Sequence, residues 1–137
     1  MAQMKDRVAI VTGGGSGMGR STSLLFAQEG AAVAVADINE TGGRETVAMI
    51  EQTGGRALFV PTDTSDEAAV VALVEETASA FGHVDARVTA AGISYSNFVE
   101  KDEATDPWRN PKEGLILNKD TARWQKVLDV NLTGVMI

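Results

Sequence analysis

Short apolar runs alternate with segments of helical periodicity along most of the chain. The runs are continuously apolar, which is typical of strands that are covered on both faces. Such strand–helix alternation predicts an α/β fold, a doubly wound parallel sheet with right-handed crossovers. The successive runs and helical segments are 8–11 and 17–29, 32–36 and 40–52, 57–60 and 66–81, and 86–91 and 121–137.

The third helical segment has the clearest apolar face. Its apolar residues recur at a spacing near 3.6, at Val70, Leu73, Val74, Ala78 and Phe81. Glycines stand where the helices are expected to end, because a left-handed residue favours glycine there. They are Gly30, Gly54–Gly55 and Gly82.

Length and composition limit the classes of protein. The 137 residues suit one domain with a buried core. The formal net charge of −7 argues against nucleic acid and an anionic membrane surface as partners, because both require basic patches. With no cysteine and one histidine, disulfides and thiol catalysis are excluded and a metal site is disfavoured. There is no signal peptide and no membrane-length apolar stretch, so we expect a cytoplasmic protein.

A long segment, residues 93–120, has no sustained periodicity and contains two prolines. Irregular segments of this length are usually functional or mobile, although a tolerated surface insertion is equally consistent with the sequence. Within it, Trp108 is either an aromatic residue that faces a substrate or a packing anchor of the segment itself.

Five glycines occupy the seven positions 13–19, between the first apolar run and the first helical segment. The pattern is Thr12-Gly13-x-x-x-Gly17-x-Gly19, not the strict G-x-G-x-x-G. Early glycines allow a tight turn with positive φ and a close approach of pyrophosphate to the backbone. Gly19 is expected to let the helix pack close to the sheet, and the helix N-terminus offers free N–H groups to an anion. The alternative is a plain strand-to-helix turn.

Asp37 ends the second strand, 20 positions after Gly17. A carboxylate there can accept hydrogen bonds from an adenosine ribose diol, although a lone Asp at a strand end is also an ordinary N-cap. The combination favours dinucleotide binding, and it favours NAD over NADP because a 2′-phosphate would meet a negative charge. Ser16 and Ile38 are uncharged, and Arg20 lies inside the helix, where its side chain can leave the site.

At these residues the chain resembles the short-chain dehydrogenase/reductase family. The matching stretches are TGGGSGMG (12–19), ADIN (36–39), DTSD (63–66), TAAG (89–92) and VLDVNLTGV (127–135). The resemblance implies a Rossmann-type NAD-binding domain over 1–137, interrupted by the long 93–120 segment. It implies cofactor-binding roles for Thr12, Gly13, Gly15, Ser16, Gly17, Met18, Gly19, Asp37, Ile38, Asp63, Thr64, Ala90, Ala91 and Gly92.

Asn131 matches the active-site asparagine of the family, which acts indirectly by holding a water near the catalytic lysine. It falls inside an apolar stripe of the last helical segment, so its amide is expected to be buried and to need partners. The alternative is an asparagine that bonds a local carbonyl and bends the helix.

The chain departs from the family pattern at two strand positions. Thr89 and Ala90 replace the usual asparagine pair, which puts the side-chain bonds that tie this strand to its neighbours in doubt. Arg87 occupies a position expected to be apolar, where a buried arginine would need an acid or carbonyl partner.

The family's catalytic Ser and Tyr-x-x-x-Lys are not recognisable in these residues. Tyr95 precedes the asparagine helix, whereas the family's tyrosine follows it, and Ser94 and Ser96 fail for the same reason. We therefore expect an N-terminal portion of an NAD-dependent oxidoreductase acting on a secondary alcohol or ketone, inactive alone and a homodimer or homotetramer at full length. The alternative is a non-catalytic dinucleotide-binding module or sensor.

Overall fold

Four parallel strands form the sheet in the computed structural model, which describes residues 2–94 and 120–137. The strands are β1 (Val8–Thr12), β2 (Ala32–Asp37), β3 (Arg56–Pro61) and β4 (Ala86–Thr89). Their order is β3-β2-β1-β4, and every neighbouring pair is parallel. The chain divides into two compact units, residues 1–91 with Ile137 and residues 92–136, and the sheet belongs to the first.

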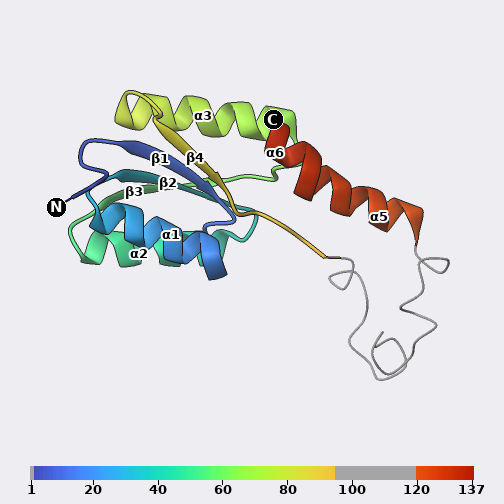
Figure 1. The fold of residues 1–137 in the computed structure, drawn as a ribbon, viewed down its shortest axis with the longest axis horizontal. Helices are drawn as coiled ribbons and strands as arrows, with labels where there is room; N and C mark the ends of the chain where they lie inside the picture. The colour runs from blue at the N-terminus through green and yellow to red at the C-terminus, as the bar shows by residue number, and fades with distance from the viewer. Residues whose placement is uncertain (1, 95–119) are drawn as a thin grey trace, which may run out of the picture. The chain divides into compact units, whose positions relative to one another are not determined.

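Helices cover both faces of this sheet (Figure 1). On one face α1 (Gly17–Gln28) and α2 (Glu40–Gln52) pack over a core that includes Val11, Val33 and Val35. On the other face α3 (Glu67–Phe81) buries Leu73 against Ile10 and Ala34. The predicted doubly wound α/β fold is therefore confirmed, and β1 and β2 are buried almost throughout.

The helix ends follow local chemistry. Asn39 caps α2 by accepting a 3.1 Å hydrogen bond from the Gly42 amide, and Asp66 caps α3 by accepting a 2.9 Å bond from the Ala68 amide. Three of the glycines expected at helix ends adopt positive φ, namely Gly30, Gly54 and Gly82. Gly55 does not share this conformation.

Two burial predictions were wrong. The inner face of α3 is formed by Val70, Leu73 and Thr77, whereas Val74 is 42% exposed because it lies at the margin of the helix–sheet contact. Strand β4 ends at Thr89 and alternates between half-buried and exposed residues, in contrast to β1. Arg87 lies on its exposed side, so the expected burial of this charge does not occur in the described residues.

The second unit contains α5 (Thr121–Leu128), a π-helical turn η3 (Asp129–Thr133) and α6 (Gly134–Met136). One continuous helix was predicted over 121–137, so the wide turn in its middle is a correction. The apolar stripe is mostly uncovered in the described chain, since Trp124, Leu132 and Met136 are 49%, 62% and 80% exposed. Most of the predicted irregular segment, with Trp108, lies outside the described residues.

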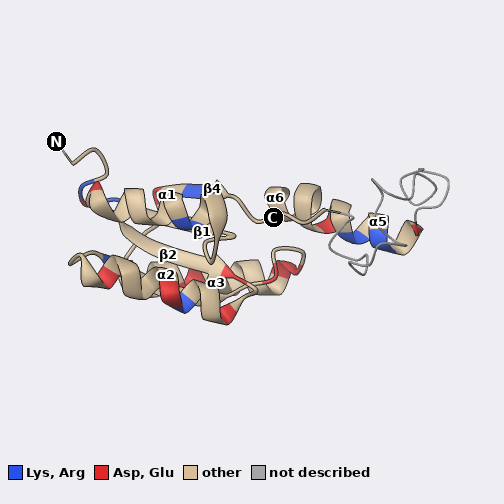
Figure 2. Cartoon of the chain, turned by 90° about the horizontal axis from the view of Figure 1, so that it is seen from below, with Lys and Arg blue, Asp and Glu red and all other residues tan. Residues whose placement is uncertain are grey.

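Figure 2 shows acidic positions in several elements of the first unit, α2 and α3 among them. Helix α3 has three glutamates and no basic residue. None of the helices in residues 2–94 and 120–137 is long and apolar enough to cross a membrane.

Asp85 joins the amino ends of β1 and β4. Its carboxylate accepts hydrogen bonds from the Val8 amide at 2.8 Å and from Arg7 Nη1 at 2.9 Å, and His83 Nε2 lies 2.9 Å away. The Val8 amide and then Arg7 hold the pKa of Asp85 below its ordinary value of 3.8. The ionised carboxylate therefore stabilises the folded state above that value, and the contribution is lost as the pH falls through the folded-state pKa.

We predict that Asp85→Asn lowers the Tm at pH 7, by on the order of a few degrees, because the variant loses the charged acceptor. The difference from wild type should begin to shrink below about pH 4, where Asp85 of the unfolded chain becomes protonated, and should continue to shrink toward the lower pKa of the folded state. Thermal unfolding followed by circular dichroism across pH 3–7 measures both effects, with Asp6→Asn as an exposed control of equal charge change. A difference in Tm that does not depend on pH would contradict the assignment.

Candidate functional site

The glycine turn between β1 and α1 brings bare backbone against its neighbours. Gly13 and Gly17 have φ of +68° and +50°, a region that L side chains rarely adopt. A Cβ on Gly13 would lie 2.6 Å from the Ala91 nitrogen, so no larger residue fits beside the end of β4. The predicted tight turn with positive φ is present at the carboxyl end of β1.

Gly19 packs directly against the turn. A Cβ at this position would overlap the carbonyl group of Gly13, so the bare residue lets α1 approach the turn that follows β1. Gly19 is buried, whereas Ser16, Gly17 and Met18 are exposed at the rim of the turn. The turn consequently has a packed inner side and an open outer side.

The N-terminus of α1 has no side-chain cap. Ser16 occupies the N-cap position in an extended conformation but makes no side-chain cap hydrogen bond, and the first turn contains no acidic residue. The N–H groups at the start of a helix lack partners within the helix and carry a partial positive charge. Such a terminus, next to a turn that excludes side chains, suits a phosphate group.

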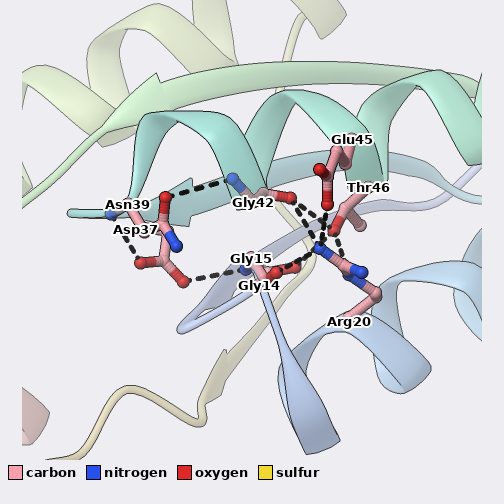
Figure 3. A network of polar contacts seen from close by, with 8 residues as sticks. All are labelled: Gly14, Gly15, Arg20, Asp37, Asn39, Gly42, Glu45 and Thr46. Atoms are coloured by element: carbon pink, nitrogen blue, oxygen red, sulfur yellow. Dashed lines mark hydrogen bonds and ion pairs between the residues drawn. The ribbon is translucent and has the colours of Figure 1, made fainter.

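Asp37 ends β2 beside this turn (Figure 3). Its Oδ2 accepts a 2.8 Å hydrogen bond from the Gly15 amide, and its Oδ1 accepts a 2.8 Å bond from the Asn39 amide. Asn39, not Asp37, caps α2, so the ordinary N-cap alternative for Asp37 does not hold. Because a carboxylate oxygen accepts two hydrogen bonds, each oxygen keeps capacity for a further donor such as a sugar hydroxyl.

Arg20 is the residue that the sequence interpretation missed. It was expected to leave the site, but its guanidinium lies behind the turn and donates to the Gly15 carbonyl at 2.6 Å (Figure 3). It also contacts α2 through Gly42, Glu45 and Thr46. No pattern in the sequence signals this arrangement, because the partners of Arg20 lie on α2, 22 to 26 positions away.

The turn after β3 lies next to the end of β2, because the Thr62 amide donates to the Asp37 carbonyl at 3.1 Å. Asp63 Oδ1 accepts from the amide and hydroxyl of Ser65, at 2.9 and 2.6 Å, which fixes the turn. Thr64 is buried. The turn thus places Asp63 and the Thr64 backbone at the same edge of the sheet as Asp37.

The end of β4 is tied to β1 without the asparagine pair of the family. Ala90 donates its amide to the Thr12 carbonyl at 3.2 Å, and Ala91 donates to the Thr12 hydroxyl at 3.4 Å. Thr12 is buried, so its hydroxyl makes this contact in a dry environment. Although Thr89 and Ala90 replace the asparagine pair, two backbone amides and the Thr12 side chain connect this strand to β1. Ala90 and Ala91 remain half-buried.

In the second unit, Asn131 lies in the π-helical turn η3 and pairs with the backbone of Ile93. Its Oδ1 accepts from the Ile93 amide at 2.9 Å, and its Nδ2 donates to the Ile93 carbonyl at 2.8 Å. The amide is exposed, so the predicted burial was wrong, although its need for partners is met by a residue 38 positions away. Gly92 lies beside it, since a Cβ there would be 3.4 Å from Asn131 Oδ1.

The described residues hold no cluster of His, Asp or Glu that could bind a metal ion. Ser94 is exposed, and Tyr95 and Ser96 lie outside the described residues. The first unit instead gathers, at the carboxyl ends of its strands, an uncapped helix terminus, a side-chain-free turn and a fixed carboxylate. Topological switch points of doubly wound sheets, here between β1 and β4, are where such folds bind nucleotides.

The comparisons with known proteins identify the family. The family profile described as short chain dehydrogenase matches residues 7–137. The chain is 38% identical over 132 residues to cis-4-hydroxycyclohexanecarboxylate dehydrogenase of Sinomonas cyclohexanicum, covering 96% of this chain and 46% of that protein. It is 41% identical over 133 residues to short chain dehydrogenase/reductase astE of Aspergillus oryzae, covering 96% and 45%.

A solved structure agrees with these relatives. A short-chain type dehydrogenase/reductase from Mycobacterium marinum superposes with a TM-score of 0.81 at 25% identity, covering 98% of this chain and 48% of that one. The fold and the sequence agree, and the chain belongs to the short chain dehydrogenase family. It spans about half the length of the curated relatives it matches.

The packing of the turn predicts different outcomes for two glycine substitutions. Gly19→Ala should lower the free energy of unfolding by about 2–4 kcal/mol, because the new methyl group overlaps the Gly13 carbonyl. Gly17→Ala should cost only about 1–2 kcal/mol, because its surroundings are open and only its positive φ is strained. Urea unfolding measures both values, and equal losses would refute the proposed contact.

Proposed function

We propose that the protein is an NAD-dependent oxidoreductase that transfers hydride between the cofactor and a secondary alcohol or ketone. Family membership and the dehydrogenase names of its relatives support this reaction class. One of these names specifies a hydroxyl group on a cyclohexane ring, which is a secondary alcohol. The observation that carries the proposal is the position of Asp37 beside the uncapped start of α1.

The residues of the first unit fit the cofactor in two parts. The amides at the start of α1 would hold the pyrophosphate, and Asp37 would accept hydrogen bonds from the adenosine ribose hydroxyls. Ile38 and Met18 are exposed apolar side chains, 76% and 81% respectively, which would cover flat apolar rings of the cofactor. Ala90, Ala91, Asp63 and Thr64 complete the proposed contacts of the first unit.

The preference for NAD over NADP follows from charge. A 2′-phosphate would meet the Asp37 carboxylate, and the nearby cation, Arg20, already donates to carbonyls behind the turn. A repelled phosphate without a free cationic partner loses affinity. These contacts support NAD as the cofactor.

The 137 residues are proposed to supply the cofactor-binding part of a longer enzyme. The relatives are about twice as long, and the family's catalytic Ser and Tyr-x-x-x-Lys follow the asparagine helix that resembles residues 127–135. The bound nicotinamide supplies hydride chemistry, and Asn131 is proposed to act indirectly in the proton path. The exposed apolar residues of α5 and α6 support a homodimer or homotetramer, and a cytoplasmic location is part of the proposal.

A non-catalytic dinucleotide-binding module or sensor is the second candidate. It is favoured by the lack of a recognisable Ser and Tyr-x-x-x-Lys in the 137 residues. The coding sequence beyond Ile137 distinguishes the two candidates. A serine followed by Tyr-x-x-x-Lys would support the enzyme, and a stop codon would support the module.

Asp37→Asn tests the cofactor assignment. Losing the charged acceptor should weaken NAD binding by about 10-fold or more and should reduce the preference for NAD over NADP. Isothermal titration calorimetry with both cofactors gives the affinities. Glu40→Gln removes an equal charge from an exposed ion pair on α2 and serves as control. Unchanged NAD affinity in Asp37→Asn would contradict the assignment.

Activity of the isolated chain provides an independent test. The 137-residue chain should show no NAD-dependent oxidation of secondary alcohols, because its residues include no recognisable general acid/base pair. NADH formation followed at 340 nm with a panel of cyclic and acyclic secondary alcohols measures this. Turnover by the fragment would show that the catalytic groups lie within residues 1–137.

A further inference from the structure

Arg20 extends from the first turns of α1 into the junction between the glycine turn and α2 (Figure 3). Its Nη2 donates to the Gly15 carbonyl at 2.6 Å and to the Gly42 carbonyl at 3.1 Å. The same nitrogen lies 3.0 Å from Glu45 Oε2, and Nε donates to Thr46 Oγ1 at 3.0 Å. One guanidinium therefore ties the carbonyl of the turn to three residues of α2.

Thr46 continues this contact toward the preceding peptide. Its hydroxyl is fully buried, accepts from Arg20, and lies within hydrogen-bond distance of the Gly14 carbonyl at 2.9 Å and the Gly42 carbonyl at 3.0 Å. The hydroxyl has one proton, which these two carbonyls share. The Gly14 carbonyl belongs to the same peptide group as the Gly15 amide.

That peptide group connects the buried contacts to Asp37. Its carbonyl faces Thr46, and its N–H donates to Asp37 Oδ2 at 2.8 Å. The following peptide group is held through its carbonyl by Arg20. A rotation of the Gly14–Gly15 peptide would therefore break its bond to Thr46 and release the Asp37 carboxylate from its Gly15 contact. Arg20 restrains this rotation in two ways, by holding the next carbonyl and by donating to Thr46 Oγ1.

We propose that Arg20, acting with Thr46, is a positioning residue that orients the Asp37 carboxylate for the ribose diol of the cofactor. This inference rests on the proposed function. Both carboxylate oxygens must lie in one fixed plane to accept from two neighbouring hydroxyls. The Gly15 amide holds Oδ2 by a hydrogen bond, and the Asn39 amide holds Oδ1, so the two amides together fix the orientation of the carboxylate.

The geometry calls for arginine and not only for a positive charge. The planar guanidinium donates from Nε and Nη2 in directions that a lysine ammonium cannot reproduce together. The arginine side chain is 26% exposed, whereas its partner Glu45 is 55% exposed. Charge-assisted bonds to carbonyls in a mostly buried setting outweigh a solvent-screened ion pair, so the carbonyl contacts carry the effect.

The test compares NAD with 2′-deoxyadenosine-NAD, which lacks one ribose hydroxyl, in the protein expressed from its complete coding sequence. Arg20→Lys and Thr46→Val should each weaken NAD binding by about 5- to 10-fold and bring the two affinities closer together. Glu45→Gln should change NAD affinity less than about 2-fold. Arg44→Gln, which removes an exposed arginine of α2, is the matched control.

A second readout separates positioning from general destabilisation. The Gly15 amide proton, observed by NMR, should move upfield in Arg20→Lys as its bond to Asp37 weakens, and the control should leave it unchanged. A variant that loses Tm but keeps the wild-type ratio of the two affinities would overturn the positioning role. If Asp37→Asn changes the ratio and Arg20→Lys does not, the inference fails alone. If wild type binds both cofactors equally, the proposed ribose contact itself fails.

Discussion

The structure depends on one constraint, the close approach of backbone to backbone at the carboxyl end of β1. The carbonyl of Gly13 occupies the space where residue 19 would carry a side chain, and the Gly15 carbonyl does the same for residue 42. These contacts bring α1, α2 and the end of β4 to one turn. Glycine is therefore required for packing there, in addition to its conformational freedom.

The fold could be predicted from the sequence because its determinants are local and periodic. The continuous apolar runs of β1 and β2 predict strands buried on both faces, and helix boundaries agree to within one residue for α1 to α3. The left-handed glycines Gly30, Gly54 and Gly82 were expected from residue type, whereas the caps Asn39 and Asp66 were not predicted. Asp37 could be related to the glycine turn because it ends the second strand, 20 positions after Gly17, and the structure has it beside Gly15.

The errors concern properties that depend on distant neighbours. Helical periodicity places Val74 and Leu73 on one side, but the extent of the sheet beneath α3 decides that only Leu73 is covered. Arg87 is exposed as well, because β4 alternates between half-buried and exposed residues. The sequence shows only that Arg20 belongs to α1. Its hydrogen-bond partners lie in the turn, 5 positions away, and on α2, up to 26 positions away. Asn131 finds its partner 38 positions away.

The contacts of Arg20 with the Gly15 and Gly42 carbonyls are important because the protein is acidic. With a net charge of −7, the chain provides little general attraction for a dinucleotide whose phosphates are negative. The described cation nearest the turn, Arg20, is directed at carbonyls and not at the open side. The proposed anion binding must then come from oriented amides at the start of α1, whose benefit depends on their fixed direction. A residue that immobilises those peptides from behind contributes to affinity without touching the ligand.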